Sequence, residues 1–167
     1  VFITSNNVKV TGGTFYGFAQ IQIDASGTPT EKTSRDWSSN SSKTETSALY
    51  FDTCDGVYID GLTAINHAGG SLMGYDCTNV RITNCYLKGI GSAYINPVDN
   101  GSDCAIYFVA ADNIGEKLAV LDFSNNRMLD HCFGARVNST RSLTMIGNDV
   151  GPIPGQHGLY GSDCDGQ

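Results

Sequence analysis

The feature that most constrains the fold of this chain is an internal repeat of about 22 residues. Five segments align with one another without a gap: residues 8–12, 57–61, 80–84, 121–125 and 143–147. The third residue of every segment is apolar, and so is the residue five positions further on. A fixed period of this length indicates a solenoid, in which each repeat is one structural unit that buries its apolar face against its neighbours.

The fifth residue of each segment is glycine or asparagine, and these five residues are Gly12, Gly61, Asn84, Asn125 and Gly147. Both residue types tolerate the left-handed region of the backbone. A short strand, one left-handed corner and a second short strand bend a β-coil without forming a hairpin. We therefore predict that the five residues stack at one corner of successive coils.

A third strand is predicted from a second set of segments that superpose, at residues 48–52, 71–75, 105–109, 134–138 and 158–162. The interval between equivalent residues is 23 from Leu49 to Leu72 and 24 from Ala135 to Leu159, and longer intervals between these pairs indicate loop insertions. No segment of ten or more residues keeps an apolar stripe at helical spacing. The predicted fold is therefore all-β: a right-handed parallel β-helix, a solenoid of three-strand coils.

The composition agrees with one β-helix domain over residues 1–167, because 40% of the residues are hydrophobic. The net charge of −7 leaves no basic surface for nucleic acid. No apolar run has the length of a bilayer span, so we expect no membrane insertion. Both ends of the sequence fall inside a coil, and a solenoid needs polar caps. We expect the domain to be open at both ends and to belong to a longer chain.

Six cysteines are present, and they are Cys54, Cys77, Cys85, Cys104, Cys132 and Cys164. They would suit three disulfides in a secreted protein, although small disulfide scaffolds are shorter and richer in cysteine. No second pair at ligand spacing accompanies the Asp-Cys-Asp segment at residues 163–165. We expect buried free thiols, with Cys54 and Cys77 stacked in neighbouring coils, and neither a metal nor a cofactor.

Two short segments resemble sequences of a known group of β-helices. His157-Gly158-Leu159 is similar to part of the Gly-His-Gly-Ile motif of polygalacturonases, with Gln156 in the place of the first glycine. Asp103-Cys104-Ala105-Ile106 is similar to their Asp-Asp-Cys segment, with Ser102 in the place of one carboxylate. No Arg-Ile-Lys segment follows downstream. With the repeat, these segments resemble the pectin-lyase-like superfamily, which includes pectate lyases, polygalacturonases and bacteriophage tailspike depolymerases.

Tailspikes are the members that the chain resembles most in character, since it is an acidic β-helix with small polar turns. The resemblance implies a protein of a virion tail, or otherwise an extracellular one, that acts on a polysaccharide. It also implies that three chains can associate as a homotrimer. Fold does not determine function, so these implications are expectations.

Side-chain alternation along the third strand predicts one inward and one outward column. Leu49, Leu72, Ile106, Ala135 and Leu159 point inward, and the next residues, Tyr50, Met73, Tyr107, Arg136 and Tyr160, point outward. Tyrosine rings can stack on sugars, and an arginine can pair with the carboxylate of an acidic sugar. The predicted substrate-binding residues are Tyr50, Tyr107, Arg136 and Tyr160. Alternatively, this column packs against another subunit or a covering loop.

The loops predicted before these strands hold all three histidines of the chain and several carboxylates, and they span residues 24–46, 65–70, 88–103, 129–133 and 151–157. Glycoside hydrolysis needs two carboxylates across the scissile bond, whereas a lyase needs a base and a group that neutralises the uronate carboxylate. The predicted catalytic residues are Asp103, Asp130, His131 and His157. The alternative for each one is a turn-forming or solvated side chain.

Three functions follow from these patterns. We favour an enzyme, a tailspike-type depolymerase that cleaves bacterial surface glycan as a glycoside hydrolase or a polysaccharide lyase, in a groove beside the outward column. The second is a non-catalytic β-helical segment for receptor binding or for a shaft. The third is a secreted pectinase, which the incomplete polygalacturonase motifs make less favoured.

Overall fold

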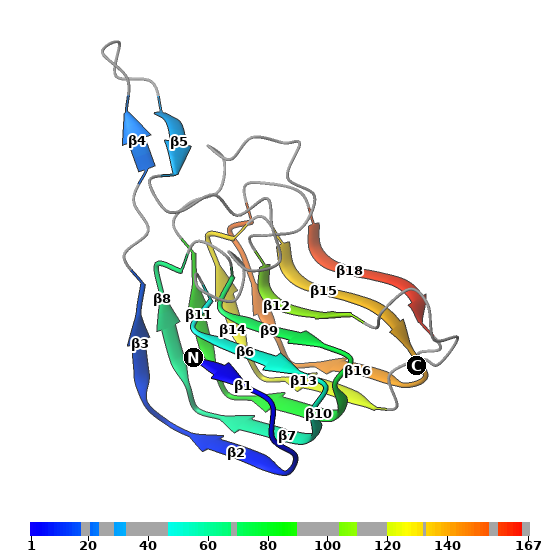
Figure 1. Cartoon of the computed structure of the whole chain (residues 1–167). Coiled ribbons are helices and arrows are strands. Elements are labelled where there is room, and N and C mark those ends of the chain that lie inside the picture. The colour runs from blue at the N-terminus through cyan, green and yellow to red at the C-terminus, as the bar shows by residue number, and fades with distance from the viewer. Residues whose placement is uncertain are drawn as a thin grey trace.

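The chain is a right-handed parallel β-helix in which three sheets form the sides of stacked coils (Figure 1). The computed structural model describes residues 1–17, 21–23, 29–32, 47–67, 70–89, 104–109, 120–131, 133–153 and 157–164. Every regular element in these ranges is a strand, so the predicted all-β class is confirmed.

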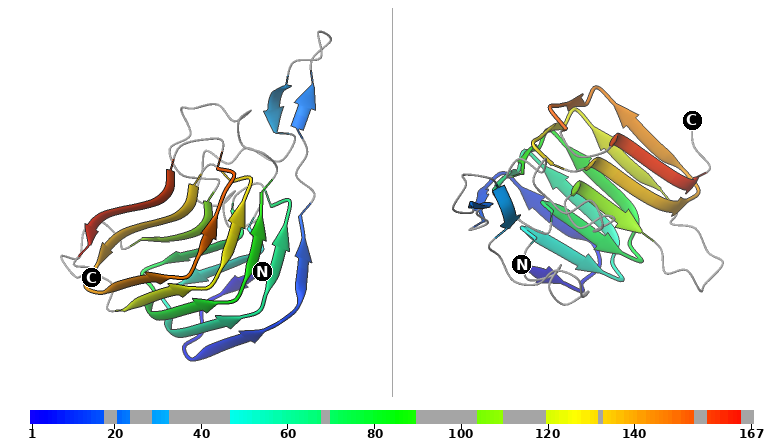
Figure 2. Two further views of the ribbon diagram at one scale, coloured as in Figure 1. Left: turned by 180° about the vertical axis from the view of Figure 1, so that it is seen from behind. Right: turned by 90° about the horizontal axis from the view of Figure 1, so that it is seen from above.

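Three parallel sheets contain strands from successive coils, which lie side by side in chain order (Figure 2). The first sheet contains β1 (Phe2–Ile3), β6 (Leu49–Asp52), β9 (Leu72–Tyr75), β12 (Cys104–Val109), β15 (Phe133–Thr140) and β18 (His157–Cys164). The second contains β2 (Val8–Thr11), β7 (Asp55–Asp60), β10 (Thr78–Thr83), β13 (Leu121–Ser124) and β16 (Leu143–Ile146). The third contains β3 (Thr14–Tyr16), β8 (Thr63–Ile65), β11 (Tyr86–Lys88), β14 (Arg127–Leu129) and β17 (Asp149–Val150).

The register of the strands is the one that the repeat predicts. Neighbouring second-sheet strands pair through Val8, Val57, Val80, Leu121 and Leu143. The five predicted corner residues all have a left-handed backbone, with φ of 65° at Gly12, 67° at Gly61, 56° at Asn84, 58° at Asn125 and 67° at Gly147. The corner prediction is therefore confirmed.

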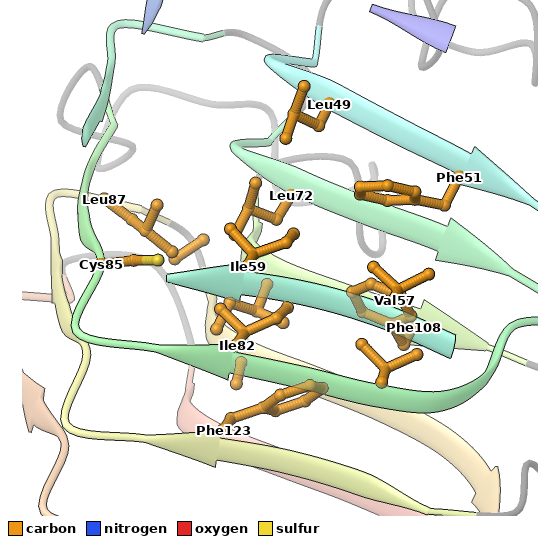
Figure 3. Close-up of a cluster of buried hydrophobic side chains, with 14 of the residues drawn as sticks. Leu49, Phe51, Val57, Ile59, Leu72, Ile82, Cys85, Leu87, Phe108 and Phe123 are labelled. Atoms are coloured by element: carbon orange, nitrogen blue, oxygen red, sulfur yellow. The ribbon is translucent and has the colours of Figure 1, made fainter. Parts of the chain in front are cut away.

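The hydrophobic core fills the inside of the coils, where side chains from the three sheets meet. Figure 3 shows part of it, including Leu49, Phe51, Val57, Ile59, Leu72, Ile82, Cys85, Leu87, Phe108 and Phe123. The side chains of Phe51, Ile59 and Phe108 are fully buried. Each coil closes the apolar face of the next one, which is why short strands suffice.

Two predictions about the first sheet need correction. Met73 lies in the outward column by register but has an exposed fraction of 0%, and the Oγ atom of Ser47 lies 2.8 Å from its Sδ atom. At this position the alternative of a covered column holds. Leu159 pairs with Ala135 as predicted but is 49% exposed, since β18 is the last described strand of its sheet.

A further difference concerns the predicted loop at residues 24–46. Part of it forms β5 (Pro29–Lys32), which pairs in the antiparallel sense with β4 (Ile21–Ile23). The other residues of that loop lie outside the described residues. An antiparallel pair inserted between two coils leaves the parallel register of the coils unchanged, because β3 and β8 still pair with each other.

The cysteines that the structure describes are free thiols: Cys54, Cys77, Cys85, Cys104 and Cys164. Cys132 lies outside the described residues. Cys54 and Cys77 occupy the same corner of neighbouring coils, since the residues that follow them, Asp55 and Thr78, are paired. The prediction of stacked free thiols at this corner is confirmed.

Candidate functional site

The candidate site lies on the outer face of the first sheet, over the neighbouring strands β12, β15 and β18 (Figure 1). Strand pairing aligns Tyr107, Arg136 and Tyr160 in one row across these strands. The row continues through Met73 to Tyr50 and ends at Phe2 on β1. The strand register therefore aligns the residues of the predicted outward column. The side chains at its two ends have different surroundings.

Arg136 is the centre of the site because its guanidinium lies against three aromatic rings. The Cζ atom is 5.5 Å from the ring centroids of Tyr107, Phe133 and Tyr160. A cation within about 6 Å of a ring face is attracted by the negative face of the π system. The Nε atom of Arg136 is buried. The positive charge is thus held at a defined place on the surface of the sheet.

His157 and Tyr160 form the exposed edge of the site. Their rings are stacked, with centroids 5.6 Å apart and an interplanar angle of 22°. Phe133 lies behind the pair, with its centroid 5.8 Å from that of His157 and 6.2 Å from that of Tyr160. His157 is exposed, whereas Phe133 is 3% exposed. The imidazole and the phenol are therefore the ring groups of this edge that a ligand can reach.

A local bend explains how Phe133 and His157 come to share a face with Arg136. Strict alternation would place residues three apart on opposite faces of a strand. In β12, however, the consecutive residues Ala105 and Ile106 both belong to the core. In β15 a Cβ atom added to Gly134 would lie 2.7 Å from the Val150 side chain, so this position also points inward, as its neighbour Ala135 does.

Small residues make this bend sterically permissible. The positions that align with Gly134 are occupied by Ala48, Ser71, Ala105 and Gly158. Because two consecutive residues turn inward, the residue before them turns outward. Phe133 accordingly packs with Cys104 in a small hydrophobic cluster, with Tyr107 against it, that is separate from the main core.

Tyr50 lies at the other end of the row, two strands away from Tyr107. Its ring centroid is 5.7 Å from that of Phe2. Burial, followed by the nearby Asp52 carboxylate, raises the pKa of Tyr50 to about 12. The phenol therefore stays neutral at physiological pH and can offer a hydrogen bond and a ring face. Between the two ends, the row is interrupted by the buried Met73.

The predicted catalytic residues do not all share this face. Asp130 faces β11 of the third sheet, where its Oδ2 atom lies 3.8 Å from Lys88 Nζ. His131 is fully buried, with Nε2 3.4 Å from the hydroxyl oxygen of Ser71. Asp103 lies outside the described residues. Of the four, His157 is the one that the structure places beside Arg136.

Sequence reasoning missed Phe133, which supports both Arg136 and the His157–Tyr160 pair. The signal was present in the alignment of Phe133-Gly134-Ala135-Arg136 with His157-Gly158-Leu159-Tyr160. The shared glycine at the second position of both segments marks a place where the strand can depart from regular alternation. An aromatic residue directly before it is turned outward.

No protein-family model, curated protein or solved structure matches this chain. Within the described ranges, no three histidine, cysteine, aspartate or glutamate side chains group together as metal ligands. A search of the same ranges finds no helix that is long and apolar enough to cross a membrane. The chemistry of the site therefore has to be argued from its own residues.

The arrangement suits a planar, negatively charged ligand. Arg136 supplies a fixed positive charge with planar donor geometry that matches a carboxylate. Tyr107 and Tyr160 supply ring surface on both sides of that charge. The exposed imidazole of His157 can accept or donate a proton. Charge recognition, stacking and proton transfer are thus available within one small area.

Proposed function

We propose that this chain binds an acidic polysaccharide on the outer face of β12, β15 and β18 and cleaves it, as a tailspike-type depolymerase. The observation that carries the proposal is the position of the Arg136 guanidinium, 5.5 Å from three ring centroids. Sugars bind proteins through stacking on aromatic rings and through charged hydrogen bonds to their carboxylates. The site offers both kinds of contact.

The reaction that these residues serve best is β-elimination at a uronate. Arg136 pairs with the uronate carboxylate and so stabilises the negative charge that develops when the neighbouring carbon loses its proton. His157, or Tyr160 beside it, accepts that proton. The glycosidic C–O bond breaks, and the leaving oxygen takes a proton and becomes an end hydroxyl of the released chain. The other product carries a carbon–carbon double bond conjugated with its carboxylate.

Hydrolysis is the alternative reaction and requires a pair of carboxylates, for which Asp103 and Asp130 are the candidates from sequence. The Asp130 carboxylate lies beside Lys88 of β11. This position favours elimination over hydrolysis as the reaction at Arg136. The same pairing is also the observation that favours the second candidate function, a non-catalytic surface that binds the glycan without cutting it.

A virion-tail or extracellular location and a homotrimeric assembly belong to the proposal as well. Light scattering of the purified chain would measure the assembly.

The proposal is tested with a panel of acidic bacterial capsular polysaccharides. Binding, new reducing ends and absorbance from unsaturated uronates are recorded for each glycan. Elimination yields both reducing ends and absorbance, hydrolysis yields reducing ends alone, and a binding surface yields neither. Binding to none of the acidic glycans would contradict the proposal.

Matched substitutions locate the activity on the molecule. Arg136→Gln should weaken glycan binding by about tenfold or more, because one charged hydrogen-bonded pair is lost. Arg81→Gln is the control, since Arg81 lies on the second sheet and pairs with Asp122 at 3.0 Å. His157→Ala should abolish cleavage and retain binding, whereas Asp130→Ala should retain both. Equal losses in Arg136→Gln and Arg81→Gln would place binding elsewhere.

A further inference from the structure

We infer that Phe133 is a positioning residue, whose ring fixes the Arg136 guanidinium and the His157–Tyr160 pair in the geometry that an acidic ligand meets. This inference rests on the proposed function for the identity of the ligand. The arrangement of the four side chains is a separate matter that can be measured without any ligand. Phe133 itself is too deeply buried to touch a sugar.

The contacts of Phe133 reach every group of the site on β15 and β18. Its ring centroid is 5.5 Å from Arg136 Cζ, 5.8 Å from the His157 centroid and 6.2 Å from the Tyr160 centroid. The contact with Tyr160 is edge-to-face, with an interplanar angle of 69°. Edge-to-face and tilted contacts restrict the orientation of both rings. One buried ring therefore couples the positions of the three outer side chains.

The residues around Phe133 hold its ring in place. On one side it packs against Cys104, which is fully buried, and the two form a cluster apart from the main core. The next residue in the chain is Gly134, and a Cβ atom added there would lie 2.3 Å from the Gly158 carbonyl oxygen. The backbone of β15 thus lies directly against that of β18 at this point.

The groups that hold the guanidinium from β12, β15 and β18 are aromatic rings. Ring faces attract a cation through their quadrupole and carry no net charge. Phe133, with Tyr107 and Tyr160, therefore holds the guanidinium in place through ring contacts.

The experiment compares two changes at Phe133 in the full chain. Phe133→Leu removes the ring, and 3,4,5-trifluorophenylalanine at the same position keeps the shape of the ring while weakening its negative face. The matched control is Phe108, a fully buried ring of the main core that packs against Phe123. The same two changes are made there. Affinity for an acidic oligosaccharide, thermal stability, and the NMR signals of Arg136 Nε–H and of the His157 ring are measured.

We expect both changes at Phe133 to shift the Arg136 and His157 signals and to weaken binding, by about tenfold for Phe133→Leu and by a smaller factor for the fluorinated ring. The changes at Phe108 should lower the melting temperature and leave the affinity and these signals as they are. Unchanged signals in Phe133→Leu, or equal loss of affinity in Phe108→Leu, would overturn the inference. If the unmodified chain bound no acidic glycan, the proposed function would fail, while the NMR comparison would still decide the role of Phe133.

Discussion

Gly134 and Gly158 lie so close together in neighbouring coils that a Cβ atom added to Gly134 would stand 2.3 Å from the carbonyl oxygen of Gly158. Gly134→Ala should therefore destabilise the chain by about 2 kcal/mol, because backbone rather than a movable side chain blocks the new methyl group. Urea unfolding measures the change. Gly158→Ala is the control, since its nearest neighbour is a Val150 methyl group at 3.3 Å. Similar losses in both variants would contradict the assigned clash.

Asn84→Val should lower the free energy of unfolding by about 1–2 kcal/mol, because a β-branched residue resists the left-handed backbone at this corner. Asn84 has a φ of 56° and also donates a hydrogen bond from Nδ2 to Asp60 at 2.7 Å. Asn84→Gly separates the two effects, since glycine accepts the backbone but cannot donate the hydrogen bond. We expect glycine to cost less than valine, and an equal cost would assign the stability to the hydrogen bond instead.

Two corner aspartates should make the fold sensitive to acid. Hydrogen bonds from Thr78 and Asn79 lower the pKa of Asp55, and those from Asn84 and Thr83 lower the pKa of Asp60. A carboxyl group whose pKa is lower in the folded state stabilises the fold above its unfolded pKa of about 4. This contribution is lost as the pH falls through the folded pKa. Urea midpoints measured from pH 6 to pH 2.5 should fall less steeply in the Asp55→Asn, Asp60→Asn double variant than in the unmodified chain.

The thiols of Cys77 and Cys85 should react slowly with a disulfide reagent at pH 8 in the native chain. Burial raises the pKa of Cys77 to about 12 and that of Cys85 to about 11, so little thiolate is present. Denaturation should restore fast labelling of both residues, as followed by peptide mass spectrometry. A mass increase of about 2 Da in a peptide pair containing Cys54 and Cys77 after reduction would show a disulfide and contradict the free thiols.

The coil geometry could be predicted from sequence because the information is local and repeated. Glycine and asparagine tolerate the left-handed backbone, and their recurrence at one position of the repeat, as at Gly12, Asn84 and Gly147, indicates a corner there. The apolar residues before and after that corner specify which faces are buried. Each coil repeats the same constraint, so the register of one coil fixes that of the next, and the observed pairing follows it.

Part of the candidate site could also be predicted. The register alone places Tyr107, Arg136 and Tyr160 in one row, and the strands confirm that row. His157 falls beside it because it begins the strand that carries Tyr160. The placement of Asp130 against Lys88 could not be read in this way, since it depends on the third sheet of a different coil.

What only the tertiary structure decided is how far each outward residue is covered and where alternation fails. Met73 is buried and in contact with Ser47, from the segment before β6, and periodicity carries no information about such a contact. Phe133 turns outward because the next two residues, Gly134 and Ala135, both turn inward, which departs from strict alternation. Sequence by itself determined the coils and the row of Tyr107, Arg136 and Tyr160, because both follow from local preferences that recur in each coil. The packing of Phe133 beneath that row depended on a departure from alternation that the repeat does not encode.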